Sequence, residues 1–369
     1  MQQLELRLRA HLLELERDGL LRTRRPPQGI DLSSNDYLGL ASHPLVKERM
    51  AAAICSLGAG STGSRLLRGE RECFTALERR FAAFKGTERA LYFSSGYLAN
   101  LAVLTTFPEA EDTIYSDELN HASLIDGARL SRASRVVFPH GCPGEVSAGA
   151  FLITESVFSM DGDFAPLQQY ARLCTKLDSA LIVDEAHSVG IYGDRGSGLI
   201  EETGIGDAVL VSINTAGKAL GVAGAFVAGP AWAIEYLAQR ARTFIFSTAM
   251  PPAVAAALDA SLDVIEAEPE RRSRVRSLAR YLRDRLRDSG IAVAPGDSPI
   301  IPVILGENDR AMAIASELQQ AGFDIRAIRP PTVAPGTARL RISVNIGLSE
   351  DILDGFVKCL VEKLCAVYS

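Results

Sequence analysis

Residues typical of several special protein classes are scarce in this 369-residue sequence. Its six cysteines form no C-x-x-C pair and none stands at zinc-ligand spacing from a histidine, so we expect neither a disulfide scaffold nor a metal site. We expect the thiols to be reduced and mostly buried. Positive charge is not in excess either: 39 lysines and arginines against 45 acids give a net charge of −6, which disfavours a nucleic-acid binder.

Long apolar runs are also missing. The least charged stretches, residues 219–234 and 243–258, are interrupted by glycines or by Pro251-Pro252 and fall short of the ~20 apolar residues of a membrane span. The first 25 residues mix acids, bases and leucines at helical spacing and lack the apolar core of a signal peptide. We therefore expect no membrane partner and a cytoplasmic location.

The composition that remains, 47% hydrophobic and 23% charged residues, is typical of an ordered globular protein. The middle of the chain alternates short β-rich runs with helical stretches, which predicts an α/β fold with a mostly parallel sheet. Several of these runs are entirely apolar, as strands covered on both faces are. Seven strands are expected, at residues 90–93, 113–116, 136–138, 151–154, 180–184, 209–213 and 225–228.

The pattern changes after Pro251-Pro252 and predicts a smaller α+β domain. We expect there a long charged helix, two strands and two helices, at residues 253–287, 300–305, 340–346, 308–320 and 350–366 respectively. The expected domains are an N-terminal helix and Arg-rich arm over 1–32, a large domain over 33–252 and a small domain over 253–369.

Polar residues follow five of the expected strands. In open α/β sheets ligands bind beyond the carboxyl ends of the strands, so these residues are the candidates for a site. They lie at 94–100, 117–121, 155–159, 184–187 and 214–218.

Lys218 is the most informative of them, because it stands between Gly217 and Ala219 with uncharged neighbours on both sides. Desolvation lowers a lysine's pKa and suits it to Schiff-base chemistry, although a surface lysine would give the same pattern. The turn at Ser94-Ser95-Gly96-Tyr97 opens a helix and offers free amides for a phosphate, or is a plain strand-to-helix turn.

Asp184 at the end of an apolar strand can hold a protonated ring nitrogen or cap a helix, and His121 and His187 can be site or structural residues. Taken together, a phosphate seat, a lysine, an acid and two histidines point to pyridoxal 5′-phosphate (PLP).

Nine collinear motifs resemble the α-oxoamine synthases, PLP enzymes of the aspartate-aminotransferase-like fold (fold type I), from about residue 20 to the C-terminus. The motifs are SSNDYLGL (33–40), GAGSTGSRLLRG (58–69), SSGYLAN (94–100), LNHASLIDG (119–127), TESVFSMDGD (154–163), DEAHSVGIYGDRGSG (184–198), TAGKALG (215–221), FSTAMPPA (246–253) and TARLRISV (337–344).

The resemblance implies a role for each matching residue. Lys218 would bind the cofactor covalently, Asp184 would hold its ring nitrogen, and His121 would stack on the ring. Arg341 would clamp the amino-acid carboxylate. Thr248 would reach the phosphate of a partner subunit, which implies a homodimer with shared sites. The other implied cofactor contacts are Ser95, Gly96, Tyr97, Ser159, His187 and Thr215, and the other implied substrate contacts are Arg22, Asn35 and Thr332.

Within the family, GSRLLRG, FSTAMPP and Gly224-Ala225-Phe226 resemble the alanine-using branch, which serves biotin biosynthesis. That implies a decarboxylating condensation of L-alanine with a pimeloyl thioester of coenzyme A or acyl carrier protein. The alternative is a relative that uses glycine or serine with another acyl group. Two segments depart from the family pattern: a short connection between Arg25 and Ser33, and His-Gly-Cys-Pro at 140–143 in place of His-Asn-Asp.

Other classes fit less well. Residues 58–63 match G-x-G-x-x-G but follow a helical stretch, which is the wrong context for a dinucleotide-binding dehydrogenase. Ser64-Arg65 stands where a P-loop ATPase needs Lys-Ser/Thr. An inactive cofactor-binding relative is disfavoured because Lys218, Asp184 and His121 are all present.

Overall fold

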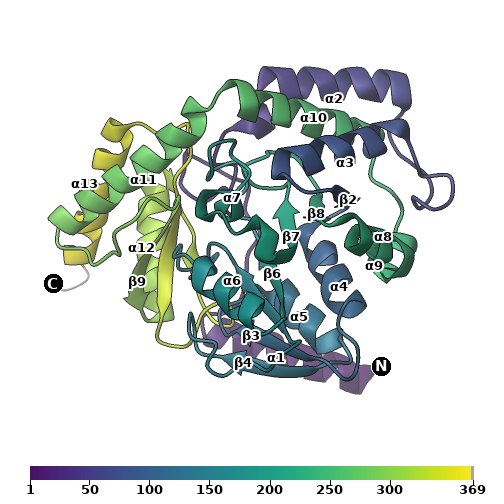
Figure 1. Ribbon diagram of the computed structural model, residues 1–369. Coiled ribbons are helices and arrows are strands. Elements are labelled where there is room, and N and C mark those ends of the chain that lie inside the picture. Colours follow the sequence, from purple (N-terminus) through teal and green to yellow (C-terminus); the bar gives the residue numbers. More distant parts are fainter. Residues whose placement is uncertain (367–369) are drawn as a thin grey trace. The chain divides into compact units, whose positions relative to one another are not determined.

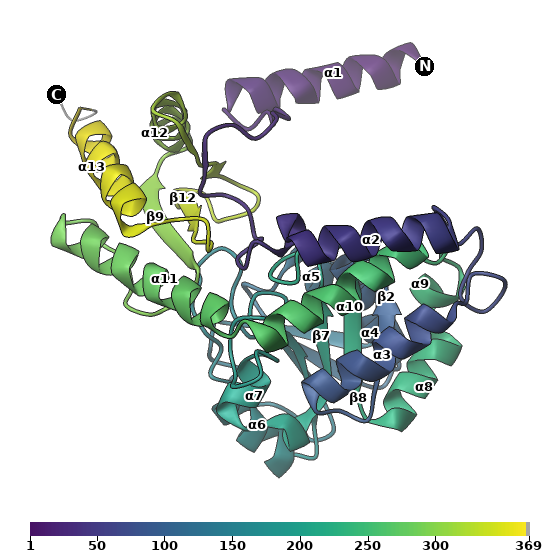
Figure 2. The same ribbon diagram turned by 90° about the horizontal axis from the view of Figure 1, so that it is seen from above.

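The computed structural model describes residues 1–366, which divide into two compact units. Unit 1 contains residues 1–34, 160–162 and the chain from 276 onward, and unit 2 contains 35–159 and 163–275. The N-terminal arm shares a unit with the C-terminal part because strand β1 (Ile30–Asp31) pairs with β10 (Phe323–Asp324). Helix α10 (Pro252–Ala267) belongs to unit 2 because it packs along α2 (Pro44–Leu57), as Figure 2 shows.

Unit 2 is built on a seven-stranded sheet in the order β2-β8-β7-β6-β5-β3-β4. Only β8 runs antiparallel to its neighbours. All seven expected strands and the mostly parallel sheet are confirmed (Figure 1). The strands are β2 (Arg89–Phe93), β3 (Thr113–Asp117), β4 (Ser134–Phe138), β5 (Phe151–Glu155), β6 (Ala180–Asp184), β7 (Val209–Thr215) and β8 (Ala225–Gly229).

The central strands are covered on both faces, which explains their unbroken apolar sequences. Ile153, Ile182 and Val211 on neighbouring strands are fully buried in one core cluster. Besides α2 and α10, the helices of this unit are α3 (Glu72–Lys85), α4 (Gly96–Thr106), α5 (Ala122–Leu130), α6 (Leu167–Lys176), α7 (Leu199–Thr203), α8 (Ala231–Arg240) and α9 (Arg242–Ile245), with short 3-10 turns at Leu40–Ser42 and Gly206–Ala208.

The single charged helix expected over 253–287 is two helices, α10 and α11 (Glu270–Asp288). The chain leaves the helical conformation at Glu268, which has φ −123° and ψ 61°. Pro269 follows, and a proline disfavours helical geometry in the residue before it and removes a backbone donor.

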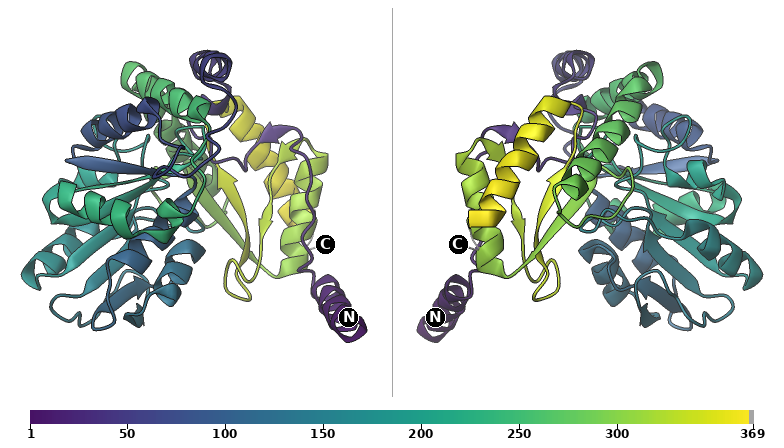
Figure 3. Two further views of the ribbon diagram at one scale, coloured as in Figure 1. Left: turned by 90° about the vertical axis from the view of Figure 1, so that its right-hand side faces the viewer. Right: turned by 90° about the vertical axis from the view of Figure 1, so that its left-hand side faces the viewer.

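Unit 1 contains a three-stranded antiparallel sheet, in the order β11-β12-β9, beside helices that share one core with it (Figure 3). Its elements are α1 (Gln2–Arg17), β9 (Ile300–Gly306), α12 (Asn308–Gln320), β11 (Ala327–Ile328), β12 (Ala338–Ser343) and α13 (Glu350–Ala366). In β12, Ala338, Leu340 and Ile342 belong to this core. Because side chains alternate along a strand, Arg339 and Arg341 lie on the opposite face.

Two other expectations concern membrane-spanning helices and the burial of the cysteines. Within residues 1–366, the structure has no helix with the length and apolar character needed to cross a membrane. The expectation that the thiols are mostly buried was wrong: only Cys174 is buried, while Cys55, Cys142 and Cys365 are exposed. Cys55 lies on a solvent-facing side of α2, whose buried residues are Val46 and Ala53.

Candidate active site

In unit 2, the residues predicted to bind the cofactor follow five strands of the sheet. β2, β3, β5, β6 and β7 run in the same direction, so their carboxyl ends lie along one edge. Asp184 is the last residue of β6, Thr215 is the last of β7, and Lys218 follows three residues later. The sheet thereby brings residues from distant parts of the sequence to one edge.

The carboxylate of Asp184 is buried and held by two donors. Asn100 in α4 donates from Nδ2 to Oδ2 at 2.7 Å, and the backbone amide of Ala186 donates to Oδ1 at 2.9 Å. Asp184 is 5% exposed. Its orientation at the end of β6 is therefore fixed by the protein itself.

His121 is linked to the same network through Ser123. Asn100 Nδ2 donates to Ser123 Oγ at 2.8 Å, and Ser123 Oγ lies 2.7 Å from His121 Nδ1. The amide of Ser123 also donates to His121 Nδ1, at 3.2 Å. Nδ1 is thus an acceptor and the ring proton of neutral His121 is on Nε2. Partial desolvation lowers the pKa of His121, with Lys218 acting in the same direction and Asp184 opposing both.

His187 is held by a second chain of hydrogen bonds. The hydroxyl of Tyr37 lies 2.7 Å from His187 Nδ1 and donates to Oδ1 of Asn35 at 3.1 Å. Tyr37 and His187 are 0% and 4% exposed. Asn35, predicted as a substrate contact, therefore lies in the network that orients the imidazole ring of His187.

The predicted phosphate seat is the start of α4. Ser95 is its N-cap and accepts from the amide of Leu98 at 3.3 Å. A Cβ at Gly96 would lie 2.3 Å from Thr215 Oγ1, so glycine is required where α4 begins beside the end of β7. Tyr97 is half-exposed and its hydroxyl donates to Asp126; this hydrogen bond raises the pKa of Tyr97.

Lys218 is half-buried and lies in a turn in which its carbonyl accepts from the amide of Gly221 at 2.8 Å. Its charge acts on both His121 and Glu155, as does the charge of Asp184. Lys218, Asp184, His121 and Glu155 therefore form one electrostatic group. Ser159 is buried at the end of the loop that follows β5.

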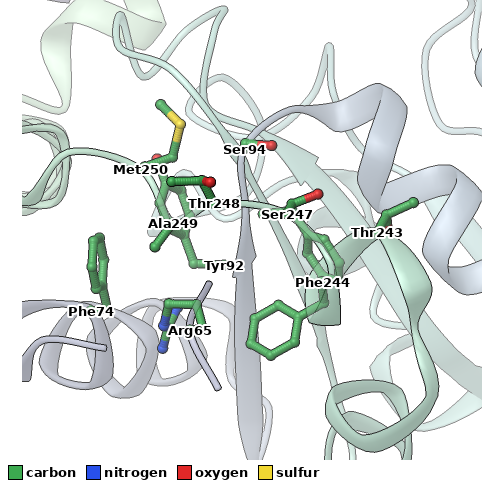
Figure 4. A pocket seen from close by; sticks show the side chains of 11 residues that line it. Arg65, Phe74, Tyr92, Ser94, Thr243, Phe244, Ser247, Thr248, Ala249 and Met250 are labelled. Atoms are coloured by element: carbon green, nitrogen blue, oxygen red, sulfur yellow. The ribbon is translucent and has the colours of Figure 1, made fainter. Parts of the chain in front are cut away.

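Thr248 lies apart from this group, in a loop that pairs with Ser64. It borders a small pocket that Figure 4 shows, with Ser94, Ser247 and Thr248 on one side and Phe74, Arg65 and Phe244 on the other. The side chain of Thr248 is exposed, as are Leu67 (81%) and Phe246 (71%) nearby in the two paired loops.

The three other predicted substrate contacts belong to unit 1. Arg22 donates to Oγ1 of Thr332 at 3.4 Å, so the structure brings these two residues together. They line a pocket with Arg25, Arg326 and Arg329. Arg341 lies on β12, is 7% exposed and donates to Ser343 Oγ at 2.8 Å.

Several residues of the networks were not singled out from the sequence. Asn100 stands inside the SSGYLAN motif and Tyr37 inside SSNDYLGL, so the motifs contained both without indicating their partners. Ser123 and Glu155 likewise fall inside recognised motifs. Only the fold shows that Asn100 contacts Asp184, 84 residues further along the chain.

The chemistry of this edge suits a ligand that carries a phosphate and a basic ring nitrogen. The first amides of α4, with the hydroxyls of Ser95 and Thr215, suit the phosphate. The buried, doubly hydrogen-bonded carboxylate of Asp184 suits a protonated ring nitrogen. Lys218 supplies the amine for a Schiff base. These residues therefore fit PLP.

Comparison with known proteins agrees with a PLP-dependent enzyme fold. Residues 27–360 match the family model described as aminotransferase class I and II. A curated relative from Anaeromyxobacter dehalogenans, named 8-amino-7-oxononanoate synthase, is 45% identical over 344 residues, which cover 91% of this chain and 86% of the relative.

Two solved structures are similar along nearly their whole length. An 8-amino-7-oxononanoate synthase from Francisella tularensis is 29% identical with a TM-score of 0.81, and the match covers 92% of this chain and 99% of that one. A serine palmitoyltransferase from S. paucimobilis, solved with bound PLP, is 27% identical with a TM-score of 0.90, covering 98% and 97%. The expected fold type is thereby confirmed.

Proposed function

Because the chain belongs to the aminotransferase class I and II family, we propose that it is a PLP-dependent acyltransferase that condenses L-alanine with a pimeloyl thioester. The products are 8-amino-7-oxononanoate, carbon dioxide and the free thiol carrier. The observation that carries the proposal is the 45% identity to an 8-amino-7-oxononanoate synthase over 91% of the chain. Similarity to serine palmitoyltransferase supports the fold and the cofactor, but a fold does not select a substrate.

When bound, PLP supplies an electron sink for the carbanion at the α-carbon of the amino acid. Asp184 would accept a hydrogen bond from the protonated ring nitrogen, because Asn100 and the Ala186 amide hold its two oxygens in a fixed orientation. Lys218 would form the covalent link to the cofactor, and its amine would be the base for the α-proton of the amino acid. Asp184 and Lys218 thus have separate tasks at one sheet edge.

The two histidines would orient the cofactor and form hydrogen bonds with the cofactor and the substrate. Neutral His121 carries its ring proton on Nε2, because Nδ1 accepts from the amide of Ser123. It would stack on the ring of the cofactor and help to polarise the carbonyl of the thioester. His187, fixed by Tyr37, contacts the phenolic oxygen of the cofactor. Ser95, Gly96, Tyr97, Ser159 and Thr215 complete the proposed cofactor contacts.

Substrate contacts are proposed for Asn35 and for residues of unit 1. Arg341 holds the carboxylate of alanine, which suits the planar two-point geometry of a guanidinium. Arg22 and Thr332 bind the acyl substrate. Their mutual contact at 3.4 Å supports a common role.

The active form in this proposal is a homodimer in which Thr248 contacts the phosphate held by its partner. Its exposure, together with that of Leu67 and Phe246, supports this part of the proposal. The domain limits expected from the sequence, the cytoplasmic location and the use of acyl carrier protein stay predictions.

A single assay series tests the function. Thiol release is followed with pimeloyl-coenzyme A, pimeloyl-acyl carrier protein and shorter acyl thioesters, each with alanine, glycine and serine. We expect the highest kcat/KM with alanine and a pimeloyl donor, with glycine poorer by the ~1–3 kcal/mol that one methyl contributes in an apolar pocket. A preference for glycine or serine with every donor would contradict the proposal.

A further inference from the structure

A second carboxyl group lies beside Asp184 and has no part in the mechanism above. Glu155 is the last residue of β5, and in the parallel pairing of β5 with β6 its register partner is Asp184. Paired residues of neighbouring strands project to the same face of a sheet. The two carboxyl groups therefore lie side by side, and Glu155 is 2% exposed.

The contacts of Glu155 connect two loops that carry predicted site residues. The backbones of His121, after β3, and of Ser159, after β5, act on its carboxyl group and lower its pKa. Its own amide donates to Oδ1 of Asn120 at 3.2 Å. Oε1 of Glu155 is buried and has no hydrogen-bond partner. The carboxyl group of Glu155 is therefore influenced by the backbone of both loops, and its buried Oε1 has no hydrogen-bond partner.

The charges around Glu155 decide its protonation. Burial raises its pKa well above the ordinary value and the neighbouring charge of Asp184 raises it further, while Lys218 and the backbones of His121 and Ser159 oppose this rise. Asp184 has donors on both oxygens, whereas Glu155 Oε1 has none. When two adjacent carboxyl groups differ in this way, the better solvated one ionises and the other keeps its proton.

We propose that Glu155 is a positioning residue that works as a neutral acid: it anchors the His121 and Ser159 loops by accepting their amides and keeps a hydroxyl proton on Oε1. This hydroxyl is a donor for an acceptor oxygen of the ligand held at Lys218. A neutral Glu155 also avoids a second negative charge beside Asp184. The charge state is a property of the protein alone, and only the identity of the ligand rests on the proposed function.

The test compares amide substitutions at the two carboxyl groups. Glutamine reproduces the shape, the acceptor and the donor of a protonated glutamate, so Glu155→Gln is expected to bind PLP within about threefold of wild type and to keep kcat/KM within about tenfold. Glu155→Ala removes the anchor and is expected to weaken PLP binding about tenfold or more, as loss of charge-assisted and buried hydrogen bonds does. Asp184→Asn is expected to lose several orders of magnitude in kcat.

A spectroscopic readout makes the test independent of turnover. The infrared spectrum of the PLP-free protein at pH 7 should contain the carbonyl band of a protonated carboxyl group, and the band should be missing in Glu155→Gln. If the variants fail to fold, titrating this band in wild-type protein still decides the question, because an ionised Glu155 at pH 7 would overturn the proposal. So would a Glu155→Gln variant as impaired in PLP binding as Glu155→Ala. A wrong amino acid or acyl substrate would change the assay series but none of these results.

Discussion

The buried charges of unit 2 and the arginine-lined pocket of unit 1 differ in their partners. In unit 2, buried charges have charged or multiple partners inside the unit: Lys85 and Glu185 form an ion pair with side chains 2% and 0% exposed, and Arg65 bonds both Glu70 and Glu78. In the arginine-lined pocket of unit 1, Arg22 and Arg25 are exposed and donate to uncharged oxygens of Thr332 and Gln319.

This difference separates two requirements of the proposed reaction. A cofactor whose electronics must be controlled needs groups that are fixed before it binds, because reorganisation during the reaction is costly. The network of Asp184, Asn100 and Ser123 meets that need. An acyl substrate that enters and leaves needs only matching charge. Desolvation and the neighbouring Arg22 lower the pKa of Arg329 in the unit 1 pocket, which indicates positive charge that an anionic group would compensate.

The largest expected effect is that of Lys218→Ala, which removes the one group of the sheet edge that bonds covalently. Wild-type protein should be yellow and should retain PLP on one peptide after borohydride reduction, and the variant should lose both the trapped cofactor and all turnover. Mass spectrometry of the reduced protein measures this. Lys47→Ala, on the exposed face of α2, is the matched control and should behave as wild type. Trapped PLP in the Lys218 variant would refute the role.

The second prediction concerns stability and compares a buried ion pair with an exposed one. Lys85→Met leaves Glu185 buried without its cationic partner, which costs about 3–5 kcal/mol in unfolding free energy. The comparison variant is Arg89→Met, because Arg89 and Glu235 form an exposed ion pair worth at most about 1 kcal/mol. Urea denaturation of both variants gives the two values. Equal losses would mean that burial does not distinguish the two pairs.

The sequence predicted the strands of the sheet well and the hydrogen-bond networks of the site poorly, for a physical reason. Each strand is recognisable from its own five to seven residues, as with ALIVD before Glu185, because burial on both faces demands local apolar composition. The bond from Asn100 to Asp184 depends on how α4 packs over β6, and no local pattern encodes it.

The incorrect expectation of one helix over 253–287 also comes from relying on local sequence patterns. Pro269 ends the helical conformation between α10 and α11, whereas a single charged helix was expected across this position. Arg341 and Arg22 were placed by resemblance alone. Their membership of unit 1 follows from long-range pairing, in which β12 joins β9 and the N-terminal arm joins β10.

A moderate effect is expected in the pocket of unit 1. Arg22→Ala should raise KM for an acyl thioester with a terminal carboxylate about tenfold or more, as loss of a hydrogen bond to a charged group does, and leave kcat and the melting temperature unchanged. A thioester without that carboxylate should show no change. Arg24→Ala is the control, because Arg24 is exposed on the same arm and does not line the pocket. A large loss of stability in Arg22→Ala would contradict the contrast between the units.

The smallest effect is expected at His140, in the segment that departs from the family pattern. Its Nδ1 lies 3.0 Å from Asp117 Oδ1 and its Nε2 lies 2.7 Å from Asp163 Oδ2. Burial lowers the pKa of His140, but the hydrogen bonds to Asp163 and Asp117 and their charges outweigh burial, so the pKa is raised. Because the pKa is higher in the folded protein than in the unfolded chain, the stabilisation is complete below the unfolded value of ~6.5 and is lost as pH rises through the folded value.

His140→Asn should therefore destabilise the protein at about pH 6 and destabilise it less at about pH 9, where wild-type His140 has lost its proton. Urea denaturation of both proteins at the two pH values measures the difference. The imidazole is partly exposed, so solvent screening keeps this effect below that of the Lys85 substitution. An equal loss at both pH values would show that His140 acts through neutral hydrogen bonds, and would place it with the uncharged contacts of unit 1 rather than with the charge pairs of unit 2.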